Sequence, residues 1–322
     1  MNIVRTLQEL IRGAPQPGEA DSAQMLGALL DDGLPELEQG ALLALLEVRP
    51  LGLPALIGFH RALAERCFRV VPPTGTVRPV LLATHCAHDR SEANLLPLLA
   101  LLLQRLGMTV LVHGSLEGAG VGGSAHVFRD LDVMPCSSLT QAQQQLDADR
   151  LAFAPTAVLA PGLASLMARR ARLDCGRLTH LLQRMLDPYA GQALAVVATG
   201  SGADARMLPS LFQTVGARAL LLEGTEGEPF ACPHRRPALE LAHEGGRELL
   251  FPSEPGIRKP RVAAADAAHT AHWTRRALRG EVPLPLPVVN QVACCLYGAG
   301  YASDINQAKA IAALETGSLV TA

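Results

Sequence analysis

Between residues 80 and 222, short apolar runs of strand length alternate with longer segments whose apolar residues recur at helical spacing. The strand-like runs are 80–84, 109–113, 151–153, 194–199 and 219–222, and helical segments lie at 94–106, 125–131, 138–149, 163–186 and 205–216. Apolar strands that alternate with helices are typical of a mainly parallel sheet covered by helices on both faces. The sequence therefore predicts an α/β fold, and 49% apolar residues in a chain of 322 provide for a packed core.

Both ends of the chain have the pattern of helices. Blocks 23–30, 37–46 and 53–63 are separated by glycine and proline, and helical segments return at 269–278, 287–298 and 305–316. We expect a small all-helical N-terminal subdomain over residues 1–70 that later helices complete, a linker over 71–79, and an α/β domain with C-terminal helices over 80–322. The helices of the two ends are expected to pack together.

Nothing in the sequence indicates a membrane or secreted protein. The longest apolar stretch, 95–103, runs into Gln104 and Arg105 and is far shorter than the ~20 residues of a membrane span. The N-terminal segment offers no apolar region of a secretory signal, so we expect a cytoplasmic protein. Seven scattered cysteines without CxxC spacing predict neither a disulfide framework nor a zinc site.

Ligands of open parallel sheets bind at the carboxyl ends of the strands, so the loops at those ends are the candidate sites. Loop 84–94 has no glycine, which disfavours close approach of a diphosphate. His85, His88 and Asp89 could form a metal site, but a polar surface loop in which Asp89 or Ser91 caps the next helix is favoured. The glycine-rich loop 113–124 is equally compatible with an anion cradle and with a flexible connection.

The loop after residue 222 contains Glu223, Glu226 and Glu228. Three glutamates could hold Mg²⁺ through water, but solvated side chains in an exposed turn are the favoured interpretation.

Arginines cluster in four parts of the chain. The segment 163–186 carries Arg169, Arg170, Arg172, Arg177 and Arg184, and the seven-residue spacing of three of them predicts one shared helix face. Further clusters are Arg235 and Arg236, then Arg258, Lys259 and Arg261, then Arg275, Arg276 and Arg279. Solvated helix faces would explain them singly, but together they predict a phosphate track for nucleic acid. The net charge of −2 argues against strong general attraction to polyanions.

Segments 21–63, 123–133, 153–155 and 290–317 resemble anthranilate phosphoribosyltransferases, and the resemblance covers essentially the whole chain. It implies a nucleoside phosphorylase/phosphoribosyltransferase-like fold. The motifs that would bind phosphoribosyl diphosphate depart from that family. The position of the diphosphate loop GTGGD holds Thr84, His85, Cys86, Ala87 and His88, with Asn94 retained, and KHGNR is replaced by Val112, His113, Gly114, Ser115 and Leu116.

Two further motifs of the family are altered. The arginine of LGxRT falls near Gly176, with Arg177 one place away, and the Asp-Glu pair that would hold magnesium is replaced around residues 226–229. Together these losses remove most of the stabilisation of a departing diphosphate, so we do not expect tryptophan-pathway activity. What remains is a degenerate phosphoribosyl-diphosphate cleft formed by Thr84, His85, His88, Asp89, Asn94, His113, Gly114 and Ser115.

Segments 89–114 and 220–230 resemble in particular the YbiB group of homologues of this enzyme. That resemblance implies a homodimer, formed through the helical subdomain, that binds DNA or RNA without sequence preference and needs no cofactor. The alternative is a glycosyltransferase or phosphoribosyltransferase with an altered acceptor, which would use Mg²⁺ and a site rebuilt from His85, His88, Asp89, His113 and the glycine-rich loop. A regulatory subunit that binds another protein through the cleft is a third hypothesis.

Overall fold

One sheet runs through the middle of the molecule. The computed structural model describes residues 3–84, 91–116, 122–170, 176–200, 205–256 and 266–316. In these segments the strands form a single sheet in the order β3-β2-β1-β4-β5-β6-β7. The parallel strands are β1 (Val80–Ala83), β2 (Val110–Gly114), β3 (Leu151–Pro155), β4 (Leu194–Ala198) and β5 (Arg218–Leu222). The predicted α/β fold with a mainly parallel sheet is confirmed.

An antiparallel hairpin that the sequence analysis did not predict completes one edge of the sheet. β6 (Leu239–His243) pairs with β5, and β7 (Gly246–Phe251) pairs with β6. Only Glu244 and Gly245 separate the two strands, and two-residue connections rich in glycine are a recognised hairpin signal. The hairpin forms one wall of a large cavity described below.

Alternate residues of the central strands are buried in two separate cores. Leu81 and Leu111 pack with helices on one face, whereas Val80 and Leu82 pack with helices on the other. The first core is shared by α1 (Ile3–Ile11), α2 (Glu19–Leu30), α3 (Glu36–Val48), α4 (Leu53–Arg66), α7 (Leu139–Asp149), α9 (Pro161–Arg170), α10 (Arg177–Met185) and α11 (Leu208–Thr214). The second is shared by α5 (Leu96–Arg105), α6 (Ser124–Asp130), α12 (Ala267–Leu278), α13 (Leu286–Gly298) and α14 (Ile305–Thr316).

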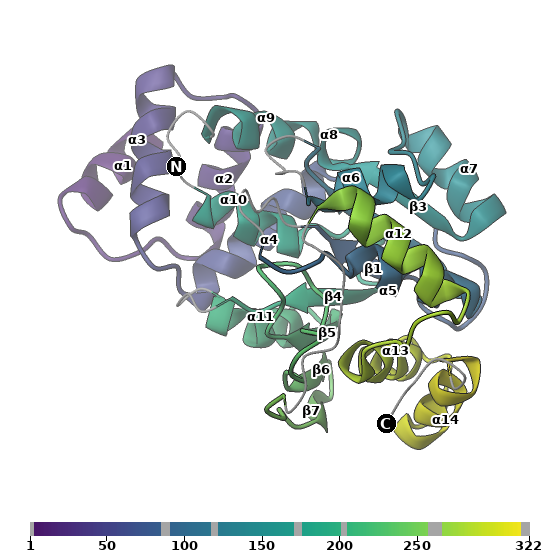
Figure 1. The fold of residues 1–322 in the computed structure, drawn as a ribbon. Helices are drawn as coiled ribbons and strands as arrows, with labels where there is room; N and C mark the ends of the chain where they lie inside the picture. Colours follow the sequence, from purple (N-terminus) through teal and green to yellow (C-terminus); the bar gives the residue numbers. More distant parts are fainter. Residues whose placement is uncertain are drawn as a thin grey trace.

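The two helical ends of the chain lie apart. α2 packs on α4 and α9, and α10 packs on α3 and α4, so later helices do complete the N-terminal unit. α13 instead packs against α5 and strands β4 to β6, and α14 packs on α13. Figure 1 shows the N-terminal helices at one end of the sheet and α13 and α14 near the hairpin. The expectation that both ends pack together is therefore wrong, because each end covers a different apolar face of the sheet.

The segment predicted as one helix over 163–186 forms two. α9 ends at Arg170 and α10 begins at Arg177, after Gly176. The carboxylate of Glu47, in α3, accepts hydrogen bonds from the backbone N–H groups of Gly176 and Arg177 at 3.0 and 2.6 Å, and so caps α10 from another helix. Because α9 and α10 are separate, Arg170, Arg177 and Arg184 do not share one helix face, and the spacing argument is wrong.

Two short elements precede longer helices. α8 (Thr156–Leu159) follows β3 directly, and the 3-10 turn η2 (Ala205–Met207) leads into α11. Among the described helices, none is long and apolar enough to cross a membrane.

Candidate ligand-binding site at the carboxyl edge of the sheet

The carboxyl ends of β1 and β2 pack closely on one another. Thr84 is buried, and its backbone N–H donates to the carbonyl of His113 at 2.7 Å. A β-carbon at Gly114 would lie only 1.8 Å from the hydroxyl oxygen of Thr84, so only glycine fits there. Thr84 and Gly114 of the predicted cleft are thus brought together, but they pack on one another rather than lining open space.

His113 is also brought to this edge, where it is buried. Burial lowers the pKa of its imidazole to about 4, so the ring is neutral near pH 7. Its Nδ1 has no hydrogen-bond partner among the described residues. A general acid or base works best with a pKa near the operating pH, so His113 does not suit the acid–base role of the enzyme alternative.

A buried carboxylate replaces the magnesium motif. Glu228 has no exposed surface, and its Oε1 accepts hydrogen bonds from Ser124 Oγ at 2.6 Å and Asn94 Nδ2 at 3.1 Å. The Asn94 Oδ1 accepts from the N–H of Leu96 at 3.1 Å, which helps to satisfy the start of α5. The prediction that the glutamates of this loop are solvated is wrong for Glu228, because its carboxylate joins α5 and α6.

Glu226, two residues earlier, also bonds to the segment that precedes α5. It lies in a tight turn closed by mutual backbone hydrogen bonds of Thr225 and Glu228, at 3.0 and 3.1 Å. Glu226 and Gly227 both have positive φ, 52° and 85°, and a left-handed glutamate costs on the order of 1 kcal/mol. Glu226 Oε1 accepts from the N–H and hydroxyl of Ser91 at 2.7 and 2.6 Å. Ser91 therefore bonds Glu226 rather than capping the next helix.

Glu92 adds a third link between the same two segments. Its Oε2 lies 2.9 Å from Nε2 of His234. Residues 91–94 are thus tied to residues 226–234 by three side-chain pairs, on the side of the sheet edge where the phosphoribosyltransferase motifs would act.

These residues do not fit a magnesium ion. The Oε1 of Glu228 already accepts hydrogen bonds from a hydroxyl and an amide N–H. The described residues contain no group of three or more His, Cys, Asp or Glu side chains placed to hold a metal. The other metal candidates, His85, His88 and Asp89, lie outside the described residues.

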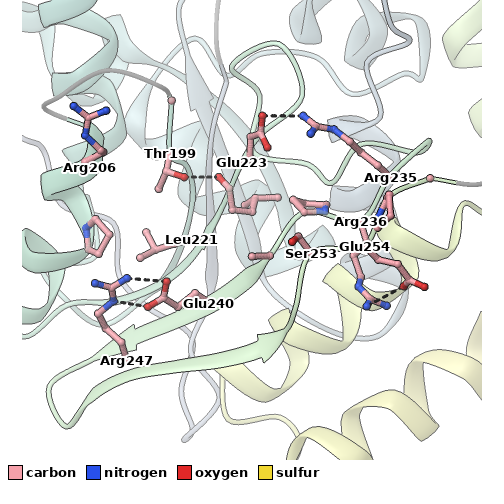
Figure 2. A pocket seen from close by; sticks show the side chains of 17 residues that line it. Thr199, Arg206, Leu221, Glu223, Arg235, Arg236, Glu240, Arg247, Ser253 and Glu254 are labelled. Carbon is pink, nitrogen blue, oxygen red and sulfur yellow. Dashed lines mark hydrogen bonds and ion pairs between the residues drawn. The ribbon is translucent and has the colours of Figure 1, made fainter.

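A large cavity lies between the ends of β4 and β5 and the β6–β7 hairpin. Its volume is about 730 Å³. Figure 2 shows arginines entering from several sides: Arg206 faces the cavity opposite Arg235, and the pairs Arg236–Glu254 and Arg247–Glu240 form further walls. Leu221, Pro209 and Pro237, which are buried, and Ala238, which is exposed, are its apolar lining.

The comparisons with known proteins agree with this architecture. No protein-family model matches the chain. The Escherichia coli K12 protein YbiB is 30% identical over 311 residues, which cover 95% of this chain and 97% of YbiB. This chain belongs to the YbiB family.

Anthranilate phosphoribosyltransferases are more distant relatives of this YbiB-family chain. The enzyme of Aeropyrum pernix is 26% identical over 314 residues, covering 94% of this chain and 89% of that enzyme. Among solved structures, anthranilate phosphoribosyltransferase from Thermus thermophilus matches with a TM-score of 0.78 at 19% identity, over 99% of this chain and 95% of that one. The Saccharomyces cerevisiae enzyme in complex with PRPP and Mg matches with a TM-score of 0.70 at 12% identity, over 98% and 93%. These likenesses establish the fold.

Within the YbiB-family chain, the arginines predicted from the segment 163–186 have different surroundings. Arg169 pairs with Asp32 at 2.6 Å. Arg177 donates to the backbone carbonyls of Leu46, Glu47 and Arg49 at the end of α3, and so joins two helices. Arg184 instead lies at the carboxyl edge, with Nη1 3.5 Å from where a β-carbon of Gly200 would stand, and burial lowers its pKa.

The remaining clusters are paired with carboxylates. Arg235 pairs with Glu223 at 2.8 Å and Arg236 with Glu254 at 2.9 Å, both at the large cavity. On α12, Arg275 pairs with Asp132 at 3.1 Å, and Arg276 and Arg279 lie 3.2 and 3.9 Å from Glu281. Outside the described residues lie the side chain of Arg170 and residues Arg172, Arg258, Lys259 and Arg261.

The YbiB-family structure adds two arginines that the sequence analysis missed. Arg206, in η2, and Arg247, in β7, line the same cavity as Arg235 and Arg236. Arg247 could have been found from the hairpin signal at Glu244-Gly245, because antiparallel pairing returns β7 alongside β6. Arg206 stands alone in the sequence, and only the approach of α11 to the hairpin brings it to the cavity.

Proposed function

We propose that this YbiB-family protein binds nucleic acid without sequence preference, as a homodimer, and does not transfer a phosphoribosyl group. The observation that carries the proposal is the altered carboxyl edge of the sheet. There, Glu228 is bonded to Ser124 and Asn94, beside a cavity ringed by arginines. Chemistry on phosphoribosyl diphosphate requires free magnesium ligands and a glycine-rich phosphate loop, and neither is supported by the residues present.

Exposed arginines supply the contacts for phosphate. The side chains of Arg235 and Arg279 are 56% and 69% exposed, and each meets its carboxylate in a surface ion pair. Such pairs contribute only ~0–1 kcal/mol, so a phosphate can replace the carboxylate at little cost. Guanidinium groups bind phosphate oxygens in a bidentate manner, which favours arginine over lysine for this purpose.

A homodimer is supported by the outer surface of the helical subdomain. Leu37 and Val48 in α3 are 81% and 77% exposed, and Ala41 and Ala44 lie between them at helical spacing. Residues at i, i+4, i+7 and i+11 share one helix face. α1 packs beside α3 and exposes Ile11, and Figure 1 shows both helices at the outer end of the molecule. An apolar stripe with small residues at its centre fits close approach of a second copy.

The test is fluorescence anisotropy with labelled DNA and RNA oligonucleotides of unrelated sequences at a series of salt concentrations. We expect similar affinities for all sequences and a linear fall of log K with log salt. Absence of binding at micromolar protein in low salt would refute the proposal. Calorimetric titration of phosphoribosyl diphosphate with Mg²⁺ tests the enzyme alternative, for which a saturable heat is required.

A further inference from the structure

The large cavity described above has a composition that suits one nucleotide. Its apolar lining consists of the buried residues Leu221, Pro209 and Pro237 and the exposed Ala238, and charged side chains surround them. The described lining contains four arginines and three glutamates, which leaves one positive charge in excess. A phosphodiester carries one negative charge per nucleotide, so the charge of the lining matches that of a single phosphate.

Two arginines are positioned to reach a phosphate at the mouth of this cavity. Arg235 pairs with the exposed Glu223 at 2.8 Å, and Arg206 faces it from the opposite wall. Nε and Nη2 of Arg247 both donate to the carboxylate of Glu240, so that pair is a fixed part of the wall. Arg184 lies behind Gly200, which also lines the cavity, and its charge adds to the positive potential there.

The size of the cavity favours an unpaired nucleotide over a nucleotide in a duplex. A volume of about 730 Å³ falls within the range of about 300–1,000 Å³ in which small ligands bind. In a duplex the bases are stacked inside, and turning one outward costs a few kcal/mol. An unpaired base carries no such cost, and it can rest on apolar and guanidinium surfaces.

We propose that this cavity receives one unpaired nucleotide of a nucleic-acid strand, with its phosphate between Arg206 and Arg235 and its base against Ala238 and the guanidinium groups of the walls. The inference rests on the proposed function and adds to it a preference for single strands. Other exposed arginines, such as those of α12, then bind the neighbouring phosphates whether or not the strand is paired.

The experiment measures anisotropy of a labelled 20-nucleotide single strand and its matched duplex. Ala238→Glu and Ser253→Glu each add a negative charge to the cavity, and both positions are exposed, so neither disturbs the core. Ala148→Glu, at an exposed position of α7 at the far edge of the sheet, is the matched control. We expect both cavity variants to weaken single-strand binding about tenfold, because the added carboxylate repels the phosphate, and to change duplex binding less than about twofold, whereas Ala148→Glu matches wild type. Circular dichroism and thermal melting confirm folding of each variant.

The failures of the two proposals are distinguishable. If wild type binds neither strand form, the proposed function itself is wrong. If wild type binds the single strand but both cavity variants bind it as tightly as Ala148→Glu does, or wild type binds the duplex equally well, the cavity inference alone is overturned. Competition adds a last arm: uridine monophosphate should displace the single strand at concentrations where inorganic phosphate does not. Equal displacement by inorganic phosphate would mean that the cavity binds only the phosphate group, which contradicts the role assigned to the base.

Discussion

The hydroxyl of Ser124 donates a hydrogen bond of 2.6 Å to the fully buried carboxylate of Glu228. The two residues are far apart in the chain, and Asn94 bonds the same oxygen. An enzyme of this fold would present a carboxylate near this position to magnesium, as the resemblance implies. Here the carboxylate holds α5, α6 and the turn after β5 together, and this bond therefore defines how the edge of the sheet differs from that of the enzyme.

The first prediction concerns that buried carboxylate. Glu228→Ala leaves the donors of Ser124 and Asn94 without their acceptor, and unsatisfied buried groups cost about 1–3 kcal/mol. We expect the free energy of unfolding in urea to fall by at least that amount. Glu223→Ala, which removes an exposed carboxylate from the same loop, is the control and should cost less than about 1 kcal/mol. Equal losses in the two variants would contradict the structural role of Glu228.

The second prediction concerns the left-handed turn. Asparagine tolerates positive φ better than glutamate, so Glu226→Asn should relieve strain while it removes the acceptor for Ser91. We expect global stability to change by less than about 1 kcal/mol, but amide exchange at residues 91–94 to become faster. Hydrogen exchange followed by mass spectrometry measures this difference. Unchanged protection of 91–94 would mean that the Glu226–Ser91 bond does not hold the segment.

The third prediction separates structural from binding arginines. Arg177 donates to three carbonyls at the end of α3, so Arg177→Ala should lower stability by about 2–3 kcal/mol and leave the salt dependence of nucleic-acid binding unchanged. Replacing Arg276 and Arg279 by alanine should leave stability nearly unchanged and weaken the salt dependence of binding. Both are surface residues that share one carboxylate partner, Glu281. For that double variant we expect the salt slope to fall by about 1–2. If the salt slope of binding fell in Arg177→Ala but not in the double variant, Arg177 would be the binding residue and the assigned roles would be wrong.

The fourth prediction concerns pH. Burial lowers the pKa of His113 from 6.5 to about 4, so between these values the unfolded state binds more protons than the folded state. Stability should therefore rise with pH through this window and fall on acidification, by an amount on the order of 3 kcal/mol in total. Denaturant unfolding at pH 5 and pH 7.5 measures the effect, and His113→Gln should reduce it. His272→Gln, at an exposed position of α12, is the control and should retain the wild-type dependence.

The fifth prediction concerns the homodimer. A glutamate at Leu37 or Val48 places a charge in the exposed apolar stripe of α3, where a buried interface would not accept it. We expect Leu37→Glu and Val48→Glu to be monomeric by light scattering coupled to size exclusion. Leu314→Glu, which alters an equally exposed leucine on α14, should leave the dimer intact. A dimer that persists in both α3 variants would place the interface elsewhere.

The local pattern of apolar residues predicted an element correctly where that pattern alone decides its position. The strands β1 to β5 lie within a residue or two of their predicted positions, because apolar runs bounded by polar residues have few other stable arrangements. α3 and α13 were also predicted to within about two residues. The helix over 163–186 failed, since Gly176 starts a new helix whose cap, Glu47, comes from a distant part of the chain. No local pattern contains that contact.

The sequence by itself determined the class of fold, the likeness to anthranilate phosphoribosyltransferases and the alteration of their motifs, because hydrophobic period and motif letters are local properties. Only the tertiary structure decided what replaced those motifs. Glu228 is buried because Ser124 and Asn94 donate hydrogen bonds to its carboxylate. Both donors come from distant parts of the chain. Arg206 and Arg247 likewise join Arg235 at one cavity through the packing of α11 on the hairpin. Contacts between distant residues depend on how elements pack, and that information is spread over the whole chain.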